Sequence, residues 1–185
     1  MLLKSIKLNN IRSYLDQKID FSLGSLLLSG DIGSGKSTIL LAIEFALFGS
    51  KPSELPASSL LRHGKKEGSV ELNFEIDGKN IIVKRILKRG KSGIKQEIGY
   101  IITNDVKKEL SPIEMKSHIF DLLGYPKDLV SKGKDLIYRY TVYTPQEEMK
   151  RILAEDKDAR LNTLRKVFNI DKYKKIKENT SVFTR

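Results

Sequence analysis

Residues 30–37 decide the fold of this chain, and they read Gly-Asp-Ile-Gly-Ser-Gly-Lys-Ser. This spacing matches G-x-x-x-x-G-K-[ST], the phosphate-binding P-loop. A triphosphate needs several backbone N–H groups that converge on it, and glycine lets the chain curl tightly enough to supply them. The alternative is a glycine-rich turn that binds no nucleotide, and the flanking sequence favours the P-loop.

The segments on either side of the loop fit a nucleotide-binding unit. Residues 26–28 are three leucines, which predict a short buried strand running into Gly30. Residues 36–48 carry apolar side chains on nearly every face, which predicts a helix that is buried almost all round. Gly49 follows, where a left-handed C-terminal cap belongs. The N-terminal end of this helix would point at the phosphates.

The chemistry of the loop implies a nucleotide and a metal ion. Lys36 is expected to reach the β- and γ-phosphates, and the Ser37 hydroxyl is expected to ligate Mg²⁺. The loop therefore predicts a nucleoside triphosphate and Mg²⁺, and we take ATP to be the nucleotide, although the loop does not distinguish it from other triphosphates.

Much of the remaining N-terminal half reads as strands, several of them with apolar and polar residues in alternation. Asp77-Gly78 is a tight-turn pair that predicts a hairpin between two of them. Residues 50–68 are rich in Ser, Pro and Lys, which predicts an irregular, exposed connection. The expected strands are residues 2–9, 17–21, 70–76, 79–87 and 96–103.

Helix-start signals mark the C-terminal half. Residues 111–114 (Ser-Pro-Ile-Glu) combine a serine cap, a first-turn proline and a capping-box glutamate, which predicts a helix that ends near Gly124. A weaker helix at 127–136 and a strand at 137–143 are expected next. Residues 144–147 (Thr-Pro-Gln-Glu) repeat the start signal. They open a helical region that continues to the C-terminus, with restarts at Asp156 and Asp171.

Composition limits the function further. The 185 residues suffice for one domain with a core, and the net charge of +11 indicates either a polyanionic partner or a solvated basic surface. The absence of cysteine excludes disulfides and thiolate metal sites, and two histidines are too few for a histidine-built metal site. No apolar run of membrane-spanning length and no signal peptide occur, so a reduced cytoplasmic compartment is expected.

A complete P-loop ATPase also needs an acid at the end of a buried strand, to hold Mg²⁺ and orient water. The best candidate in this chain is Asp105, after the apolar residues 99–103. The alternative, which we favour, is that the acid lies on a polypeptide segment that this chain lacks.

Three segments together resemble a known family: KSIKLNNIRSY (4–14), GDIGSGKSTILLAIEFALFG (30–49) and VYTPQEEMKRIL (142–153). They are similar to the N-terminal lobe of SbcC and of its archaeal and eukaryotic counterpart, the Rad-fifty ATPase. These proteins are relatives of the SMC proteins within the ABC-type ATPases. The resemblance runs in order to residue 178. The first two segments also fit SMC or RecF relatives, whereas residues 151–176 favour the SbcC/Rad-fifty branch.

The resemblance implies roles for particular positions. Arg12 would contact the nucleotide phosphates, residues 62–64 would approach the nucleotide, and Gln146 would bind Mg²⁺ and help to position water. Lys36 and Gln146 would be the catalytic residues, and Ser37 and Gln146 the metal ligands. The implied nucleotide site comprises Arg12, Gly30, Asp31, Ile32, Gly33, Ser34, Gly35, Lys36, Ser37, Thr38, Arg62, His63, Gly64 and Gln146.

Simpler interpretations of three positions stay open. Arg12 also fits an ordinary surface arginine, His63 a plain loop histidine, and Gln146 a first-turn helix residue. Two positions depart from the family pattern: Ile32 replaces the usual Asn, and Ile11 stands where Phe is commoner. The first change removes any side-chain contact from that position of the loop.

The implied fold is α/β, an ABC-type ATPase head N-terminal lobe with a P-loop helix, a mixed sheet and an antiparallel β meander. Residues 1–155 would form the lobe with the Walker A loop and the Q-loop, and residues 156–185 would lead into a coiled coil. The chain is expected to be an N-terminal fragment or a separately expressed half.

The implied partners are the protein's own C-terminal ATPase lobe, a second head in an ATP-dependent homodimer, a nuclease of the SbcD/Mre-eleven type and double-stranded DNA, with no membrane. In a prokaryote the protein would be associated with the nucleoid. Basic residues at 88–91 and 107–108 are candidate DNA contacts, and a solvated surface explains them equally well.

Three competing functions are retained. A small stand-alone P-loop kinase or NTPase would need its own acid, such as Asp105. A nucleic-acid module with a vestigial P-loop would bind DNA without regard to ATP. An SMC- or RecF-type chromosome-maintenance head would share the opening and the loop.

Overall fold

The computed structural model describes residues 1–51 and 55–124 and, nearer the C-terminus, residues 154, 156–167, 170, 173, 176, 177 and 179–181. The chain divides into two compact units, Met1–Gly133 and Lys134–Arg185. The expected helix at 127–136, the strand at 137–143, the helix start at 144–147 and the restart at Asp171 lie outside the described residues. The domain boundary at residue 155 stays a prediction.

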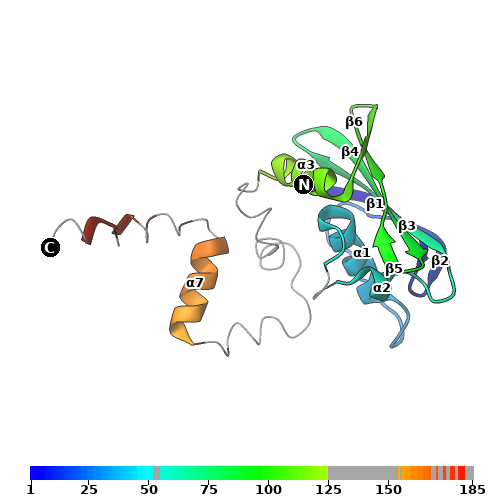
Figure 1. Ribbon diagram of the computed structural model, residues 1–185, viewed down its shortest axis with the longest axis horizontal. Coiled ribbons are helices and arrows are strands. Elements are labelled where there is room, and N and C mark those ends of the chain that lie inside the picture. Colours follow the sequence, from blue (N-terminus) through cyan, green and yellow to red (C-terminus); the bar gives the residue numbers. More distant parts are fainter. Residues whose placement is uncertain are drawn as a thin grey trace. The chain divides into compact units, whose positions relative to one another are not determined.

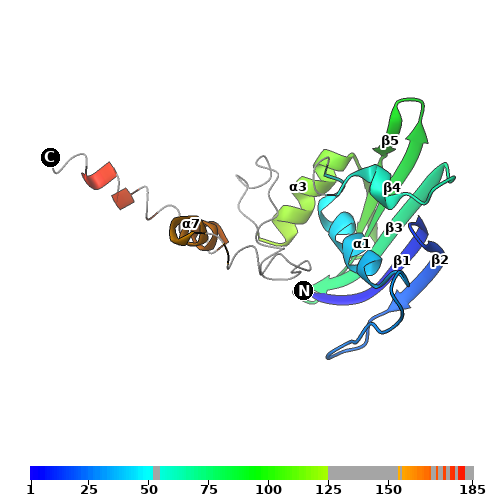
Figure 2. The same cartoon turned by 90° about the horizontal axis from the view of Figure 1, so that it is seen from below.

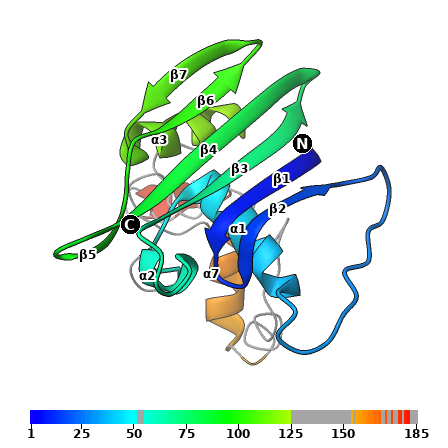
Figure 3. The same ribbon diagram turned by 90° about the vertical axis from the view of Figure 1, so that its right-hand side faces the viewer.

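The first unit is built on one seven-stranded sheet (Figure 3). The strand order is β2-β1-β3-β4-β6-β7, and β5 pairs with β4 beyond this path. Every pairing among the described strands is antiparallel, so the parallel part of the expected mixed sheet does not occur among them. The strands are β1 (Leu2–Ile11), β2 (Tyr14–Asp20), β3 (Glu67–Ile76), β4 (Lys79–Gly90), β5 (Gly93–Gln96), β6 (Gly99–Thr103) and β7 (Val106–Leu110).

The expected central hairpin is confirmed. Val70, Leu72 and Phe74 of β3 are completely buried, and the residues between them are half-buried on the other face of the sheet. Both turn residues have positive φ angles, 51° at Asp77 and 72° at Gly78. Those angles match the right-handed twist of the two strands, which makes the pair a strong hairpin former.

The strand expected at 96–103 is instead two strands. β5 pairs with β4 near Leu87, and β6 pairs with β4 near Ile82. A second tight turn at Asn104-Asp105, with φ angles of 48° and 62°, then leads into β7, which the sequence did not predict. Only the last residue of β7 is even half-buried, so this edge strand lacks the apolar alternation that marks a strand.

Two helices cover one face of the sheet (Figures 1 and 2). These are α1 (Lys36–Phe48) and α3 (Pro112–Leu122), and the rings of Phe48 and Phe120 meet edge to face at 5.7 Å. α3 begins with the predicted capping box, in which the Ser111 hydroxyl accepts from the Glu114 amide.

The burial of α1 agrees with the prediction along its C-terminal part, where residues 42–48 are all buried. Its C-terminal cap differs from the expectation. Gly49 has a φ of 79° but a ψ of −175°, which is not the left-handed helical conformation. The Gly49 amide donates to the Phe45 carbonyl at 2.8 Å, so the last turn closes on a backbone bond and the chain then leaves in an extended direction.

The connection at 50–68 was expected to be exposed, and that expectation was wrong for its apolar residues. It contains the short helix α2 (Ala57–Leu60), and Leu55, Leu60 and Leu61 are buried. Leu61 forms a β-bridge with Ile11, so the segment is fastened to the end of β1 and shields the core there.

The strand expected at residues 26–28 does not form. Leu26 is 48% exposed and Leu27 is 87% exposed. A strand needs a neighbour for its backbone groups, and none of the described strands pairs with this segment.

The second unit contains α7 (Lys157–Val167), which begins directly after Asp156, where a restart was predicted. The Asp156 carbonyl accepts from the Arg160 amide at 3.0 Å. Among the described residues of both units, no helix is long and apolar enough to cross a membrane.

Candidate nucleotide-binding site

The P-loop turns on three glycines with positive φ angles. These angles are 147° at Gly30, 85° at Gly33 and 97° at Gly35, and Gly35 is the N-cap of α1. Residues with a Cβ rarely adopt such angles, so the glycines allow the tight curl. The loop therefore leads directly into the N-terminal end of α1, where free amides and the helix dipole favour an anion.

The side chain of Lys36 folds back over this loop. Its Nζ donates to the Gly30 carbonyl at 2.7 Å and to the Asp31 carbonyl at 2.8 Å, and it lies 3.4 Å from Ser34 Oγ. These bonds join the first residues of the loop to the first residue of the helix. The ammonium group is consequently held at the mouth of the loop.

A cavity of about 350 Å³ lies in front of the helix end. Its walls come from two places that are distant in sequence, the P-loop with the first turn of α1 and the turn between β1 and β2. The lining residues are Arg12, Ser13, Gly33, Gly35, Lys36, Ser37 and Thr38.

The structure thus brings together six of the residues that were predicted for the nucleotide site, and it adds Ser13. Gly30, Asp31, Ile32 and Ser34 belong to the same loop but do not line the cavity. Arg62, His63 and Gly64 are not among its lining residues either, and Gln146 lies outside the described residues. Ser13 was not predicted, although its position could have suggested it, because it follows Arg12 in the turn after β1.

Arg12 is fixed by bonds to the segment around α2. It has a φ of 46°, its amide donates to the Leu60 carbonyl at 2.9 Å, and its Nε donates to the Ser59 carbonyl at 2.8 Å. Its guanidinium makes no further hydrogen bond to another described residue, which leaves the terminal nitrogens available on the cavity wall.

The β1–β2 turn also contacts the P-loop directly. The Tyr14 hydroxyl donates to the Gly35 carbonyl at 3.3 Å. A Cβ placed on Gly35 would lie 2.7 Å from Ser13 Oγ and 3.0 Å from the Tyr14 hydroxyl. Gly35 is therefore required twice, by its φ angle and by the close approach of the turn.

Asp105, the one acid proposed within this chain, is not part of the site. It is an exposed residue of the β6–β7 turn, and Thr103, the last residue of β6 before this turn, pairs with Ile81, near the start of β4. Arg12, by contrast, follows the end of β1, the end that lies beside the start of β3. Because β3 and β4 are antiparallel, the start of β3 lies beside the C-terminal end of β4. Arg12 and Asp105 therefore lie toward opposite ends of the strands.

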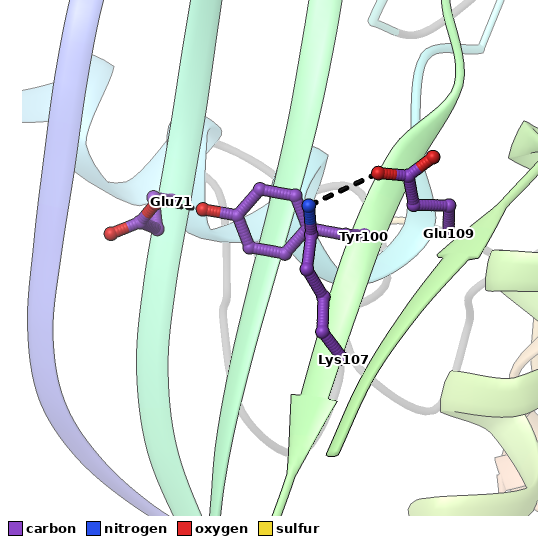
Figure 4. A network of polar contacts seen from close by, with 4 residues as sticks. All are labelled: Glu71, Tyr100, Lys107 and Glu109. Atoms are coloured by element: carbon purple, nitrogen blue, oxygen red, sulfur yellow. Dashed lines mark hydrogen bonds and ion pairs between the residues drawn. The ribbon is translucent and has the colours of Figure 1, made fainter. Parts of the chain in front are cut away.

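One of the two basic segments is engaged in local contacts on the sheet surface (Figure 4). Lys107 forms an ion pair with Glu109 at 3.0 Å and lies 4.7 Å from the centre of the Tyr100 ring. The Tyr100 hydroxyl donates to Glu71 at 2.7 Å. Burial, helped by the hydrogen bond to Glu71 and by its charge, raises the pKa of Tyr100 to about 12.

Comparison with solved structures identifies the fold. A solved structure described as "Structural biochemistry of ATP-driven dimerization and DNA stimulated activation of SMC ATPases" superposes with a TM-score of 0.63. The match covers 90% of this chain and 99% of that chain at 20% identity. The chain accordingly has an ABC/SMC-type ATPase head fold, and the predicted α/β class is confirmed.

Sequence comparison then places the chain in a family. The model of the AAA domain family matches residues 5–183, and the chain belongs to that family. The "DNA double-strand break repair Rad50 ATPase" of Methanocaldococcus jannaschii is 29% identical over 175 residues, 95% of this chain and 16% of the relative. The SbcC component of the nuclease SbcCD of Staphylococcus aureus (strain MRSA252) is 30% identical over 188 residues, 94% of this chain and 18% of the relative.

These matches confirm the resemblance to the SbcC/Rad50 ATPases that the three sequence segments indicated. The chain spans less than a fifth of the length of these relatives, 16% in one and 18% in the other.

Proposed function

We propose that this chain is the ATP-binding N-terminal part of a DNA double-strand-break repair ATPase of the Rad50/SbcC type. The observation that carries the proposal is the cavity in which Lys36 and Ser37 of the P-loop face Arg12 of the β1–β2 turn. That cavity occurs in a chain whose homology to Rad50 extends over nearly its whole length.

The residues that line the cavity fit a nucleoside triphosphate with Mg²⁺. The wall offers two cationic groups, Lys36 and Arg12, beside the free amides of the first turn of α1. The Ser37 hydroxyl makes no hydrogen bond to another described residue, so it is free to act as an oxygen ligand. Mg²⁺, when bound, would neutralise part of the phosphate charge.

Each side chain then has a distinct task. Lys36 binds the β- and γ-phosphates, and Ser37 holds the metal ion. Arg12 approaches the phosphates from the opposite wall. Arg62, His63 and Gly64 lie near the nucleotide, and Gln146 binds the metal and orients the attacking water.

The site is completed by other polypeptide segments. The part of the chain that the structure describes contains no cluster of three or more acidic, histidine or cysteine side chains that would hold a metal ion, and Asp105 is remote. We propose that the protein's own C-terminal lobe supplies the acid and that a second head closes the site in an ATP-dependent dimer. The names of the relatives mention DNA double-strand break repair and the nuclease SbcCD, which supports DNA and a nuclease as partners. We propose that this nuclease is of the SbcD/Mre-eleven type. The compartment would be the cytoplasm.

The test measures ATP binding and Mg²⁺-dependent hydrolysis by the chain alone. We expect binding that Lys36→Ala abolishes and no turnover until the matching C-terminal lobe is added. Lys91→Ala is the matched control, because it removes the same charge from an exposed loop between β4 and β5.

The alternatives give different results. Robust turnover by the chain alone, lost in Lys36→Ala, would indicate a complete small kinase or NTPase. DNA binding that neither ATP nor Lys36→Ala affects would indicate a nucleic-acid module with an inactive loop.

A further inference from the structure

The side chains of two arginines, Arg12 and Arg62, join the β1–β2 turn to the segment around α2 by hydrogen bonds to backbone carbonyls. The Arg12 side chain donates to the Ser59 carbonyl at 2.8 Å. In the other direction, Nη1 of Arg62 donates to the carbonyls of Arg12 and Ser13, at 2.8 and 2.9 Å. The backbones are joined as well, because the Arg62 amide donates to the Asn10 carbonyl at 2.9 Å.

The two carbonyls that Arg62 binds lie at the turn between the strands. The pairing of β1 with β2 ends at Ile11 and Tyr14, so Arg12 and Ser13 are outside the ladder. Arg12 also has a φ of 46°, a conformation that is uncommon for a residue with a side chain. Such a conformation persists where its surroundings fix it. The two bonds from Arg62 contribute to this, together with the bonds that Arg12 itself makes to Leu60 and Ser59.

The turn transmits its position to the P-loop. Ser13 and Tyr14 pack against Gly35, and the Tyr14 hydroxyl donates to the Gly35 carbonyl. A shift of the turn would therefore move the Arg12 wall of the cavity and release Gly35, the N-cap of α1. Contacts to phosphate require correct placement of the donors, so a looser turn weakens binding.

We propose that Arg62 is a positioning residue of the nucleotide cavity. It acts through the Arg12–Ser13 turn and not by contact with the phosphates. This inference rests on the proposed function, and it gives Arg62 a role that differs from direct nucleotide contact. Arg62 is absent from the cavity wall, whereas both residues whose carbonyls it binds line it.

The experiment compares Arg62→Ala with Arg89→Ala in the 185-residue chain. Arg89 is the matched control, because its Nε also donates to a backbone carbonyl, that of Lys65, at an exposed site. Amide hydrogen exchange without nucleotide and the dissociation constants for ATP and ADP are measured for each variant. The rate of amide hydrogen exchange is followed at residues 12–14 and at Gly35.

We expect Arg62→Ala to speed amide exchange at residues 12–14 in the absence of nucleotide. We also expect it to raise the dissociation constants for ATP and ADP by similar factors, each about tenfold. Arg89→Ala should change neither property. The double variant Tyr14→Phe, Arg62→Ala should raise the dissociation constant for ATP by less than the product of the two single effects. Both substitutions act on the same contact, that of the β1–β2 turn with Gly35. If Arg62→Ala does not fold, Arg62→Gln, which keeps a donor of shorter reach, takes its place.

Two results would overturn the inference. Weaker ATP binding with unchanged exchange at the turn would mean that Arg62 touches the phosphates directly. Faster exchange with unchanged nucleotide affinity would mean that the turn does not control the cavity. If the wild-type chain binds no nucleotide, the proposed function fails, and the exchange at residues 12–14 still decides whether Arg62 fixes the turn.

Discussion

The buried arginine of β4 gives the sharpest test of how the P-loop helix is held. Arg85 is completely buried beneath the C-terminal end of α1. Its Nε donates to the Ala46 carbonyl at 2.7 Å, and its Nη2 donates to the Leu47 carbonyl at 3.0 Å. Carbonyls in the last turn of a helix have no partner within the helix, so the guanidinium completes the helix end. The perturbation is Arg85→Met, which keeps an unbranched apolar side chain and removes the donors.

The magnitude follows from three contributions. Each hydrogen bond from a charged donor is worth about 1.5–3 kcal/mol, and a cation at a partly buried helix C-terminus adds up to about 2 kcal/mol. Against these stands the cost of burying a guanidinium, several kcal/mol, which methionine avoids. Two buried carbonyls are left without their arginine donor, so we expect a net loss of about 3 kcal/mol in the free energy of unfolding.

The assay is urea unfolding of the chain, followed by circular dichroism. The matched control is Arg89→Met on the same strand, where the arginine is exposed and its bond to the Lys65 carbonyl is 3.2 Å long. We expect a change within about 0.5 kcal/mol there. If the stability of Arg85→Met also stays within that limit, the helix end does not depend on the guanidinium and the reasoning fails.

Three further results are expected. Gly99→Ala should cost about 1–3 kcal/mol of stability, because the new methyl would overlap a carbonyl of β4. Gly90→Ala, where the methyl meets nothing nearer than 3.7 Å, should be neutral or slightly stabilising, and thermal unfolding compares the two. Tyr100 has a pKa of about 12, above the usual 10.0, so its contribution to stability is complete below pH 10 and is lost as the pH rises through 12. Glu71→Gln should lower this pKa while burial keeps it above 10.0, and ultraviolet titration reports it. Ser111→Ala should cost about 0.5–2 kcal/mol by removing the cap of α3, measured by urea unfolding against the parent chain.

Elements whose pattern is local were predictable from the sequence. The capping box at Ser111 and the turn at Asp77-Gly78 each depend on a few neighbouring residues, and both formed as expected. The P-loop is likewise local, since its glycines and Lys36 fix both the curl and the start of α1. The apolar alternation also predicted β3 and β4, which the structure places at the centre of the sheet.

Elements that depend on distant partners were not predictable. Residues 26–28 are as apolar as a buried strand, but a strand requires a neighbour, and the described part of the chain supplies none. The segment at 50–68 looked exposed because of its Ser, Pro and Lys content. Its few leucines are nevertheless buried. Leu61, for example, bridges to Ile11 of β1, which is distant from it in sequence. The role of the Arg62 side chain is invisible in sequence for the same reason, because the carbonyls that it binds lie about fifty residues away.

The two ends of α1 are therefore held by different kinds of contact, and the difference has a consequence for nucleotide binding. At the C-terminal end, Arg85 fixes the helix to the middle of the sheet from within the core. At the N-terminal end, the loop touches a turn whose geometry depends on exposed or half-buried groups, Tyr14 and Arg62. A ligand that binds at the N-terminal end can order that turn without disturbing the core. Nucleotide should consequently protect residues 12–14 and the P-loop from exchange and leave residues 46–48 unchanged. Equal protection at both ends would mean instead that α1 responds to nucleotide as one rigid body.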